Sequence, residues 1–293
     1  MKMKRSTGEN IFDTANILFL IILSITILIP MLHIIANSLS DSIPLMRGDV
    51  KLWPVGLNID NYILVVKNSV FLNSFKITFF LVTFGTLVNL FLTFITAYPL
   101  SRPGFRGRKF FMLFILFTLI FKVPVIPLYL VVRSLRIINT VWAMIIPTAI
   151  QAFNLILCVT FFKTSIPSDL IDAAKVDGMS EYGILARVVL PLSKPIVMTL
   201  LLFYAVHHWN SYYHAILFIT DHRLRPLQLY LYQMLSQSDV NDAMANANEL
   251  TVNTTPKGII SATVVAATMP IVIVYPFIQK HFVKGALLGS IKE

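Results

Sequence analysis

The sequence predicts an all-α integral membrane protein with six transmembrane helices, and three observations support this fold class. Of the 293 residues, 56% are hydrophobic and only 13% are charged, whereas soluble domains average about 45–50% and about 25%. The mean hydropathy is +0.76. The apolar residues are also grouped in runs of about twenty, the length that a helix needs to cross a hydrocarbon core of about 30 Å. Inside that core every backbone polar group needs an internal partner, so these runs must be helical.

We expect the six spans to form one transmembrane domain over residues 1–293. The expected ranges are 16–36, 71–99, 110–130, 140–162, 195–218 and 259–279. The first run is too long for the apolar part of a signal peptide and lacks a small-residue cleavage site, so we expect it to be retained. A charged segment at 163–194, here called the insert, separates the fourth span from the fifth. The long loops 37–70 and 219–258 resemble solvated, partly flexible caps.

The distribution of lysine and arginine predicts the orientation of the chain. The N-terminus, the loop 100–109, the insert and the C-terminal tail together carry 14 of these residues, whereas the opposite side carries 8 over much longer segments. Because cytoplasmic loops are enriched in bases, we expect both termini and the insert to lie in the cytoplasm. The tight turn SRPGFRGRK has four bases and no acid. We assign this basic turn an orienting role only.

The sequence gives no support to several function classes. The bases form no stripe with interleaved aromatic residues, which argues against nucleic-acid binding. The single Cys158 excludes disulfides and cysteine-based metal sites. Neither an HExxH-like pair nor a G-x-x-x-x-G-K-[ST] phosphate loop occurs, so any ATP hydrolysis must come from a partner. We therefore expect a non-catalytic chain that binds neither metal nor cofactor.

The insert contains two short helix-like segments that meet at Gly178. Ser168 is suited to cap the first helix, and the acid Asp172 suits its positive end. Gly178 suits the left-handed position that follows a helix. Ser180 is suited to cap a second helix, which we expect to end before Pro191. The physical pattern leaves two alternatives open: a docking element for another protein, or a solvated interfacial loop.

The insert also resembles a known motif. The residues D-A-A-x-x-D-G from Asp172 to Gly178, followed after nine residues by V-x-L-P from Val188 to Pro191, resemble the EAA loop. That loop marks the membrane subunits of binding-protein-dependent ABC importers. Asp172 replaces the usual glutamate of this motif, and Val188 replaces the usual isoleucine. Further segments resemble the maltose-permease-like carbohydrate-uptake branch, closest to the permeases for lipoprotein, aldouronate and alginate-type polysaccharides: AYPLSRPGFRGRK, VPVIPLYLVVRSLRIINTVWAMIIP, HWN, LRPLQLYL and YPFIQKHFVKGALLGSIKE.

This resemblance implies a function and a set of partners. The chain would be a permease subunit in the bacterial cytoplasmic (inner) membrane that moves an oligosaccharide or polysaccharide by alternating access. An acidic, uronate-containing chain such as alginate is one candidate substrate. The implied partners are a second homologous permease subunit, two ATPase subunits that bind ATP and Mg, and an extracytoplasmic solute-binding protein. The implied ATPase-coupling residues are Asp172, Ala173, Ala174, Asp177, Gly178, Leu190 and Pro191.

Polar residues at membrane depth are the candidates for a substrate pathway, because such residues are costly unless they face partners or water. In the fifth expected span, HHWNSYYH (207–214) contains His208, Asn210 and Tyr213. Aromatic faces suit the C–H groups of a sugar, and a planar amide suits its hydroxyls. The alternative is an interfacial aromatic belt with polar groups that bridge helices.

Three further polar residues extend this candidate pathway. Gln151 and Asn154 are three residues apart in the fourth expected span and should share a face; interhelical hydrogen bonding is the alternative. Lys122 lies within the third expected span, just before Pro124 and Pro127. Its ammonium would meet a uronate carboxylate, or the prolines would open the helix so that the lysine reaches water.

Two rival classes make different demands on the sequence. A self-contained secondary sugar transporter predicts inverted repeats and ion-coordinating acids at the midplane. All fourteen acids fall outside the expected spans, and such a transporter would have no use for the insert. A multispanning membrane enzyme would need acids or histidines clustered near one face.

Overall fold

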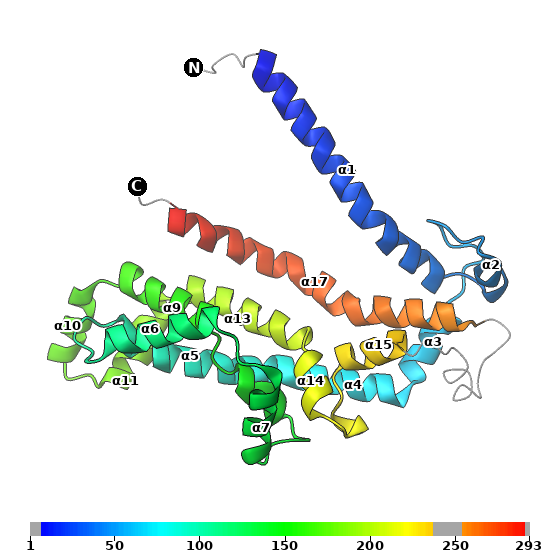
Figure 1. Ribbon diagram of the computed structural model, residues 1–293. Coiled ribbons are helices and arrows are strands. Elements are labelled where there is room, and N and C mark those ends of the chain that lie inside the picture. Colours follow the sequence, from blue (N-terminus) through cyan, green and yellow to red (C-terminus); the bar gives the residue numbers. More distant parts are fainter. Residues whose placement is uncertain (1–6, 237–253, 291–293) are drawn as a thin grey trace. The chain divides into compact units, whose positions relative to one another are not determined.

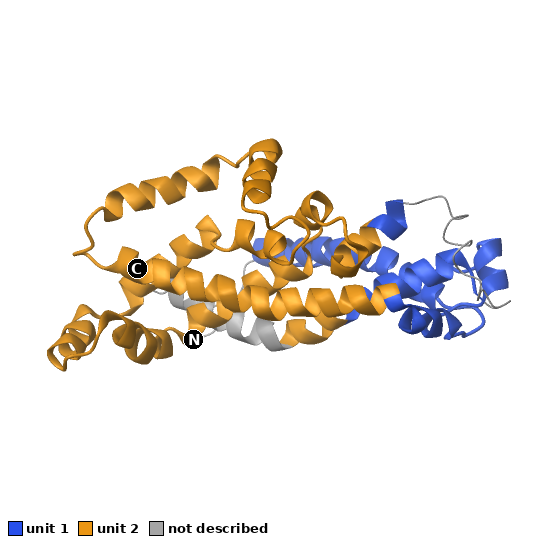
Figure 2. Ribbon diagram, turned by 90° about the horizontal axis from the view of Figure 1, so that it is seen from below, with its two compact units in different colours: residues 1–69, 233–269 blue, residues 70–232, 270–293 orange. Residues whose placement is uncertain are grey.

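The computed structural model describes residues 7–236 and 254–290, and every regular element in this part of the chain is helical (Figure 1). The β-pairing within these residues is an isolated bridge between Ser40 and Leu57. The chain divides into two compact units, coloured separately in Figure 2. Unit 1 comprises Met1–Ser69 and Gln233–Met269, and unit 2 comprises Val70–Tyr232 and Pro270–Glu293.

Six segments are long and apolar enough to cross a membrane, when each bent helix pair is counted as one span. The continuous segments are Gly8–Ser38, Ser69–Ser101 and Pro256–Pro276. The bent pairs are Arg108–Ile120 with Val125–Ser134, Trp142–Thr148 with Ala152–Ser165, and Glu181–Leu192 with Lys194–Trp209; Glu181–Leu192 belongs to the insert, and Lys194–Trp209 begins the fifth expected span. The predicted fold class, an all-α membrane protein with six spans, is confirmed.

Unit 1 contains a folded segment where the sequence suggested a solvated cap. After α1 (Thr7–Ser38) come α2 (Ser42–Arg47) and α3 (Asp60–Lys67). The buried side chains of Ala36, Leu45 and Val50 pack together. The loop 37–70 is therefore structured, because it buries apolar side chains against the end of α1. The second expected cap begins with helix α15 (Leu227–Ser236), and its residues 237–253 lie outside the described part.

Unit 2 is built around three helices. These are α5 (Thr86–Ser101), α9 (Ala152–Ser165) and α13 (Lys194–Trp209). Their buried side chains belong to one hydrophobic cluster, which also includes residues of the insert. Figure 1 shows the insert helices α10 (Ser168–Val176) and α11 (Glu181–Ile184) at one end of this bundle and α14 (Tyr213–Phe218) at the other.

The remaining elements of unit 2 precede, link or follow these three helices along the chain. They are α4 (Ser69–Phe80), η1 (Leu81–Gly85), α6 (Arg108–Ile120), α7 (Val125–Ser134), α8 (Trp142–Ile145), η2 (Ile146–Thr148), η3 (Leu185–Val189), α12 (Leu190–Leu192) and η4 (His222–Leu224). Helix α17 (Pro256–Ser290) begins in unit 1 and ends in unit 2. In unit 1 its Gly258 lies against Asn61, where an added Cβ would come within 2.8 Å of the amide.

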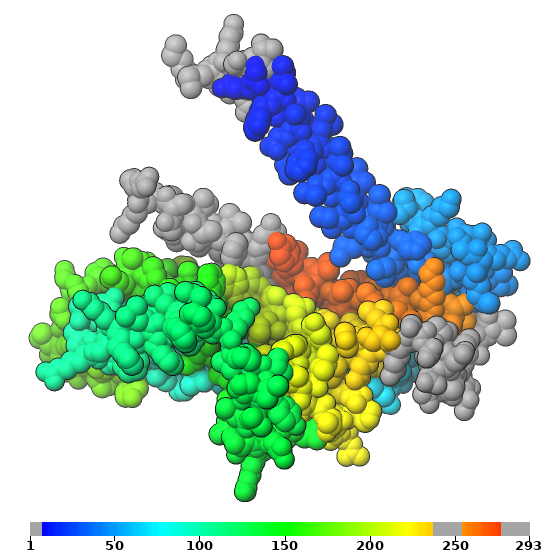
Figure 3. Space-filling view, in the orientation of Figure 1, coloured from blue at the N-terminus to red at the C-terminus, as the bar shows by residue number. Residues whose placement is uncertain are grey.

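The third expected span, 110–130, is not one helix. Helices α6 and α7 are separated by residues 121–124 and meet at 120°. Pro124 has no N–H for a helical hydrogen bond and favours an extended conformation at Val123, so the helix ends before it. Helix α7 consequently projects from the rest of unit 2 in Figure 3, where it is green.

The fourth and fifth expected spans, 140–162 and 195–218, are also interrupted. A 52° bend separates Trp142–Thr148 from Ala152–Ser165, and the extended Gln151 (φ −90, ψ 126) lies at the break. In the fifth expected span, helix α13 ends at Trp209, and the chain turns before α14 begins at Tyr213. Continuous apolar runs predicted single helices, whereas backbone breaks inside the runs divide them.

Candidate functional site

The turn of the insert has the local structure that its sequence predicts. Gly178 has a φ of 78°, in the left-handed region that only glycine adopts without strain. The N–H of Met179 donates to the carbonyl of Ala174 at 3.0 Å, as in a helix-terminating turn. The Oγ of Ser180 accepts a hydrogen bond from the N–H of Gly183 at 3.2 Å. The expected glycine turn and the serine cap of the second helix are both confirmed.

Two details of the insert differ from the prediction. Ser168 does not cap the first helix: it is the first residue of α10, and its hydroxyl contacts Asp169 instead. The second helix does not end before Pro191, since the chain stays helical to Leu192. A π-helical turn, Leu185–Val189, comes directly before Leu190 and Pro191. Its wider backbone accommodates a proline ring that would clash within a regular α-helix.

The insert has one buried face and one exposed face. Ile171, Ala174, Ile184, Leu185 and Val189 are buried in the hydrophobic cluster of α5, α9 and α13. The insert is therefore packed onto the bundle and is not a loose linker.

The predicted coupling residues divide between these two faces. The exposed ones are Asp172, Ala173, Asp177, Gly178 and Pro191, while Ala174 is buried and Leu190 is partly buried against the cluster. Sequence reasoning missed an exposed apolar residue, Val176, whose side chain is 88% exposed at the end of α10. An apolar residue on the polar side of a short amphipathic helix was the available signal.

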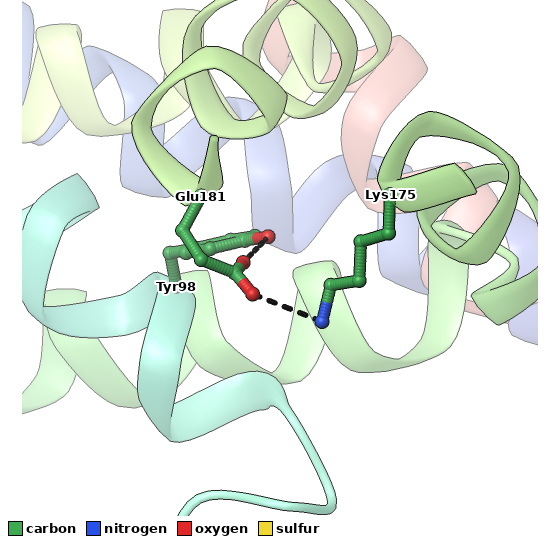
Figure 4. A network of polar contacts seen from close by, with 3 residues as sticks. All are labelled: Tyr98, Lys175 and Glu181. Carbon is green, nitrogen blue, oxygen red and sulfur yellow. Dashed lines mark hydrogen bonds and ion pairs between the residues drawn. The ribbon is translucent and has the colours of Figure 1, made fainter. Parts of the chain in front are cut away.

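A polar network joins the insert to the end of α5, as Figure 4 shows. The Tyr98 hydroxyl donates to Oε2 of Glu181 at 2.7 Å. The Nζ of Lys175 lies 2.9 Å from Oε1 of the same carboxylate. The guanidinium carbon of Arg102 lies 4.9 Å from the centroid of the Tyr98 ring, in cation–π range. The Glu181 carboxylate thus binds the Tyr98 hydroxyl of α5 and the Lys175 ammonium of α10.

The surroundings of this network shift the pKa values of two of its groups, Glu181 and Arg102. Hydrogen bonds from Lys175 and Tyr98 lower the pKa of the Glu181 carboxyl below its usual value. Burial lowers the pKa of the Arg102 guanidinium. Its buried Nε and Nη2 have no hydrogen-bond acceptor among the described residues.

A cleft of ≈ 700 Å³ lies beside this network, between the basic turn (Arg102 and Phe105) and the insert (Asp172). The basic turn therefore lines a cleft together with the insert, a feature that its predicted orienting role does not require.

A second polar group, here called the polar layer, lies inside the bundle. It consists of Asn89, Thr93, Thr148, Gln151, Asn154, Tyr204 and His208, which are contributed by α5, by the two halves of the fourth span and by α13. The Nδ2 of Asn89 lies 3.1 Å from Nε2 of His208, and the hydroxyls of Thr93 and Tyr204 are 2.7 Å apart. These contacts connect α5 to α13 at two successive levels.

A close backbone approach shapes one end of the polar layer. Gly85 ends a π-helical turn, Leu81–Gly85, and a Cβ placed on it would lie 2.7 Å from Nε2 of His208. Only glycine leaves room for the imidazole at this point. Isolated π turns are frequent at functional sites in helical proteins.

Three of the predicted pathway residues belong to the polar layer. The side chains of His208 and Asn154 are each only 1% exposed. Gln151 lies at the helix break, so it does not share a helix face with Asn154 as expected; instead, Nδ2 of Asn154 donates to Oε1 of Gln151 at 3.3 Å. Most groups of the layer are buried and hydrogen-bond one another, whereas Oδ1 of Asn89 and Nδ1 of His208 have no hydrogen-bond partner among the described residues.

The other three predicted residues lie apart from the layer. Lys122 is exposed at the break between α6 and α7. The amide of exposed Asn210 donates to the carbonyl of Val206 in its own helix at 3.0 Å, and exposed Tyr213 begins α14. Sequence reasoning missed Asn89, Thr93, Thr148 and Tyr204, whose only signal was a polar group within an apolar run.

Comparison with known proteins identifies the family. Residues 89–287 match the model of the binding-protein-dependent transport system inner membrane component family. The chain is 41% identical over 292 residues to protein LplC of Bacillus subtilis (strain 168), covering 99% of this chain and 98% of LplC. It is 39% identical over 286 residues to the polygalacturonan/rhamnogalacturonan transport system permease protein YtcP of the same organism, covering 97% and 99%.

A solved structure shares both the fold and much of the sequence. It is the crystal structure of a bacterial ABC transporter involved in the import of the acidic polysaccharide alginate. One of its chains matches with a TM-score of 0.90 and 33% identity, over 96% of this chain and 100% of that one. The family model covers more than half of the chain, and the relatives match nearly end to end. The chain therefore belongs to the inner membrane components of binding-protein-dependent transport systems.

Proposed function

We propose that this chain is a permease subunit of an ABC importer for oligosaccharides or polysaccharides. Transport proceeds by alternating access and is driven by separate ATPase subunits, which hold the ATP and Mg. The observation that carries the proposal is the insert, a helix–glycine–helix body that packs by one face onto the bundle and exposes the other. A self-contained transporter has no use for such a body.

The exposed face of the insert is the ATPase docking surface. It presents Asp172, Ala173, Val176, Asp177 and Gly178. Val176 supports this assignment because an apolar side chain that is 88% exposed gains free energy when a partner covers it. Both termini and the insert lie in the cytoplasm, as the positions of the bases predict.

The other partners follow from the family. The transport systems to which it belongs depend on a binding protein, so an extracytoplasmic solute-binding protein delivers the sugar. A second homologous permease subunit completes the pathway. The apolar side chains along α1, among them Ile17, Phe19 and Ile22, are exposed and so can contact lipid and such a partner.

The substrate is an acidic, uronate-containing chain. YtcP is named for polygalacturonan and rhamnogalacturonan, and the transporter of the solved structure imports alginate. Lys122 is a lysine exposed at a helix break inside an apolar run, where its ammonium can meet a carboxylate. The polar layer, with His208 at one end, offers amides, hydroxyls and an imidazole to sugar hydroxyls once it opens.

The proposal is tested by purification followed by an ATPase assay. We expect the chain to co-purify with an ATPase and a second permease subunit, and acidic oligosaccharides to stimulate hydrolysis in the presence of the binding protein. Ion-driven uptake by this chain alone, without an ATPase, would instead identify a secondary transporter.

The charge of the substrate is tested with Lys122→Ala. We expect stimulation by oligogalacturonate or alginate oligosaccharides to fall about tenfold, with stimulation by neutral oligosaccharides unchanged. Lys76→Ala, at another exposed lysine of a span, is the control and should change neither. Equal losses for acidic and neutral sugars with Lys122→Ala would exclude charge recognition by this residue.

A further inference from the structure

Both covalent connections of the insert to the bundle are breaks in helical structure. Ile166, between α9 and α10, has an extended backbone (φ −112, ψ 110). At the other end Ser193 separates α12 from α13, and the helices on either side are bent by 89°. Ile166 and Pro167 interrupt the helical backbone at one connection and Ser193 interrupts it at the other, so no continuous helix joins the insert to the bundle. A displacement of the insert therefore reaches the bundle through side-chain contacts as well as through the backbone.

The side-chain contacts of the insert with α5 provide one such route, because a hydrogen bond adds to the apolar packing there. Ala97, Tyr98 and Leu100 of α5 share the hydrophobic cluster with the buried face of the insert. The Tyr98 hydroxyl reaches out of this cluster to Glu181, and Lys175 holds the other oxygen of the same carboxylate. The Tyr98 residue is only 6% exposed, so its ring is fixed and its hydroxyl has a defined position.

The same helix enters the polar layer at its other end. Helix α5 is continuous from Thr86 to Ser101 and carries Asn89, Thr93 and Tyr98. At about 1.5 Å per residue, Asn89 lies roughly 13 Å along the helix from Tyr98. One rigid element thus links the Glu181 carboxylate to His208 and Tyr204.

We propose that Tyr98 and Glu181 are positioning residues that fasten the insert to α5, so that movement of the insert reaches the polar layer through α5. This inference rests on the proposed function, because it takes the insert as the docking body of the ATPase. Lys175 contributes less, since the pair that it forms with Glu181 is about half exposed and water weakens it. Its role is to orient the carboxylate toward the tyrosine.

Tyr98→Phe removes the hydrogen bond and keeps the buried ring. The assembled complex is reconstituted in lipid nanodiscs with its ATPases and binding protein, and hydrolysis is measured with and without alginate oligosaccharides and, separately, oligogalacturonate. We expect the variant to retain its ATPase subunits and its basal hydrolysis. The substrate-stimulated increment should fall about tenfold, because a hydrogen bond to a carboxylate is among the stronger kinds.

Variants of Glu181 give a graded second readout. Glu181→Ala removes the Tyr98 hydrogen bond and also the half-exposed pair with Lys175, so it should lose at least as much stimulation as Tyr98→Phe. The double variant should lose no more than Glu181→Ala alone, because the Tyr98 hydrogen bond is already absent there. Glu181→Gln keeps an accepting oxygen and should recover part of the stimulation. If Tyr98 and Glu181 only stabilised the structure, each variant would lower the amount of assembled complex, and more so the more contacts it removes. The stimulation per assembled complex would then stay constant.

Tyr182→Phe is the matched control. Tyr182 is the next residue of the same helix, is 76% exposed, and its hydroxyl has no hydrogen bond within the described residues. It should behave as the wild type. If Tyr98→Phe matches Tyr182→Phe while the wild type is stimulated, the positioning role is wrong and the proposed function stands. If the wild-type chain recruits no ATPase at all, the proposed function itself fails.

Discussion

The insert and the polar layer are the two polar regions of an apolar chain, and they are built in opposite ways. The turn of the insert is made by neighbours in sequence, since Gly178 and Ser180 set its backbone and its cap within a few residues. The polar layer joins residues far apart in the chain, such as Asn89 and His208, which are 119 positions apart.

This difference matches the role that we propose for each region in transport. A docking body must keep its shape while it moves, and local caps together with a buried face maintain that shape. A pathway must open, and hydrogen bonds between membrane helices average only about 0.6 kcal/mol. The contacts of the polar layer are thus weak enough to be exchanged for sugar hydroxyls. Substitutions in the two regions should therefore differ in what they change and by how much.

Replacing the turn glycine should have the largest effect on activity, because it should remove substrate stimulation altogether. Gly178→Val puts a β-branched side chain at a φ of 78°, which costs about 1–2 kcal/mol and changes the turn between α10 and α11. We expect membrane insertion to continue and substrate-stimulated ATPase activity to fall to the basal rate, measured in reconstituted complexes. Gly104→Ala is the control, because Gly104 has an ordinary φ and open space for a Cβ. Full stimulation of the Gly178 variant would show that the turn is not a coupling element.

The close contact in the polar layer should give the next largest effect. Gly85→Ala places a methyl group 2.7 Å from Nε2 of His208 and should displace the imidazole from Asn89. Overpacking of this kind costs about 1–3 kcal/mol, which thermal unfolding in detergent would record. The double variant with His208→Ala should recover much of the loss, because the smaller side chain frees the space. Strictly additive losses would contradict this steric explanation.

Removing one interhelical hydrogen bond should have a smaller effect. Thr93→Val deletes the hydroxyl that contacts Tyr204 and keeps the shape of the side chain. We expect a loss of about 0.6 kcal/mol and at most about 1.7 kcal/mol in unfolding free energy. Thr160→Val is the control, because the exposed Thr160 hydroxyl bonds only the carbonyl of Ile156 in its own helix. A loss well above this range would mean that the polar layer is a rigid structural core and does not open readily.

The smallest effect should come from the charge of Glu181. Its pKa is lowered in the folded state by Lys175 and Tyr98, so its contribution is present above the ordinary glutamate pKa of about 4.3 and is lost as pH falls through the lowered value. Because the ion pair is about half exposed, we expect the wild type to exceed Glu181→Gln in stability at pH 7 by under about 1 kcal/mol. The difference should be lost as pH falls below the lowered pKa, and thermal unfolding at pH 7 and at successively lower pH values measures it. A difference that grows toward low pH would contradict this assignment.

Much of the insert was predictable because its determinants are local. Gly178 and Ser180 act on the backbone within one turn, and the confirmed turn and cap follow directly from their side chains. The two errors, at Ser168 and Pro191, also concern helix ends, where capping and a π turn compete with simple rules. The alternation of apolar runs and charged segments likewise determined six spans and set the insert apart from them.

Tertiary structure alone decided which polar groups meet. Tyr98 and Glu181 are 83 positions apart, and neither is unusual in its own segment. Their hydrogen bond, the cleft beside the basic turn and the membership of the polar layer all depend on how α5 packs against α9, α13 and the insert. Caps and turns arise from short-range backbone chemistry that the sequence displays directly. Contacts between helices arise from the complementary packing of many side chains at once, and so they emerge only when the helices are brought together.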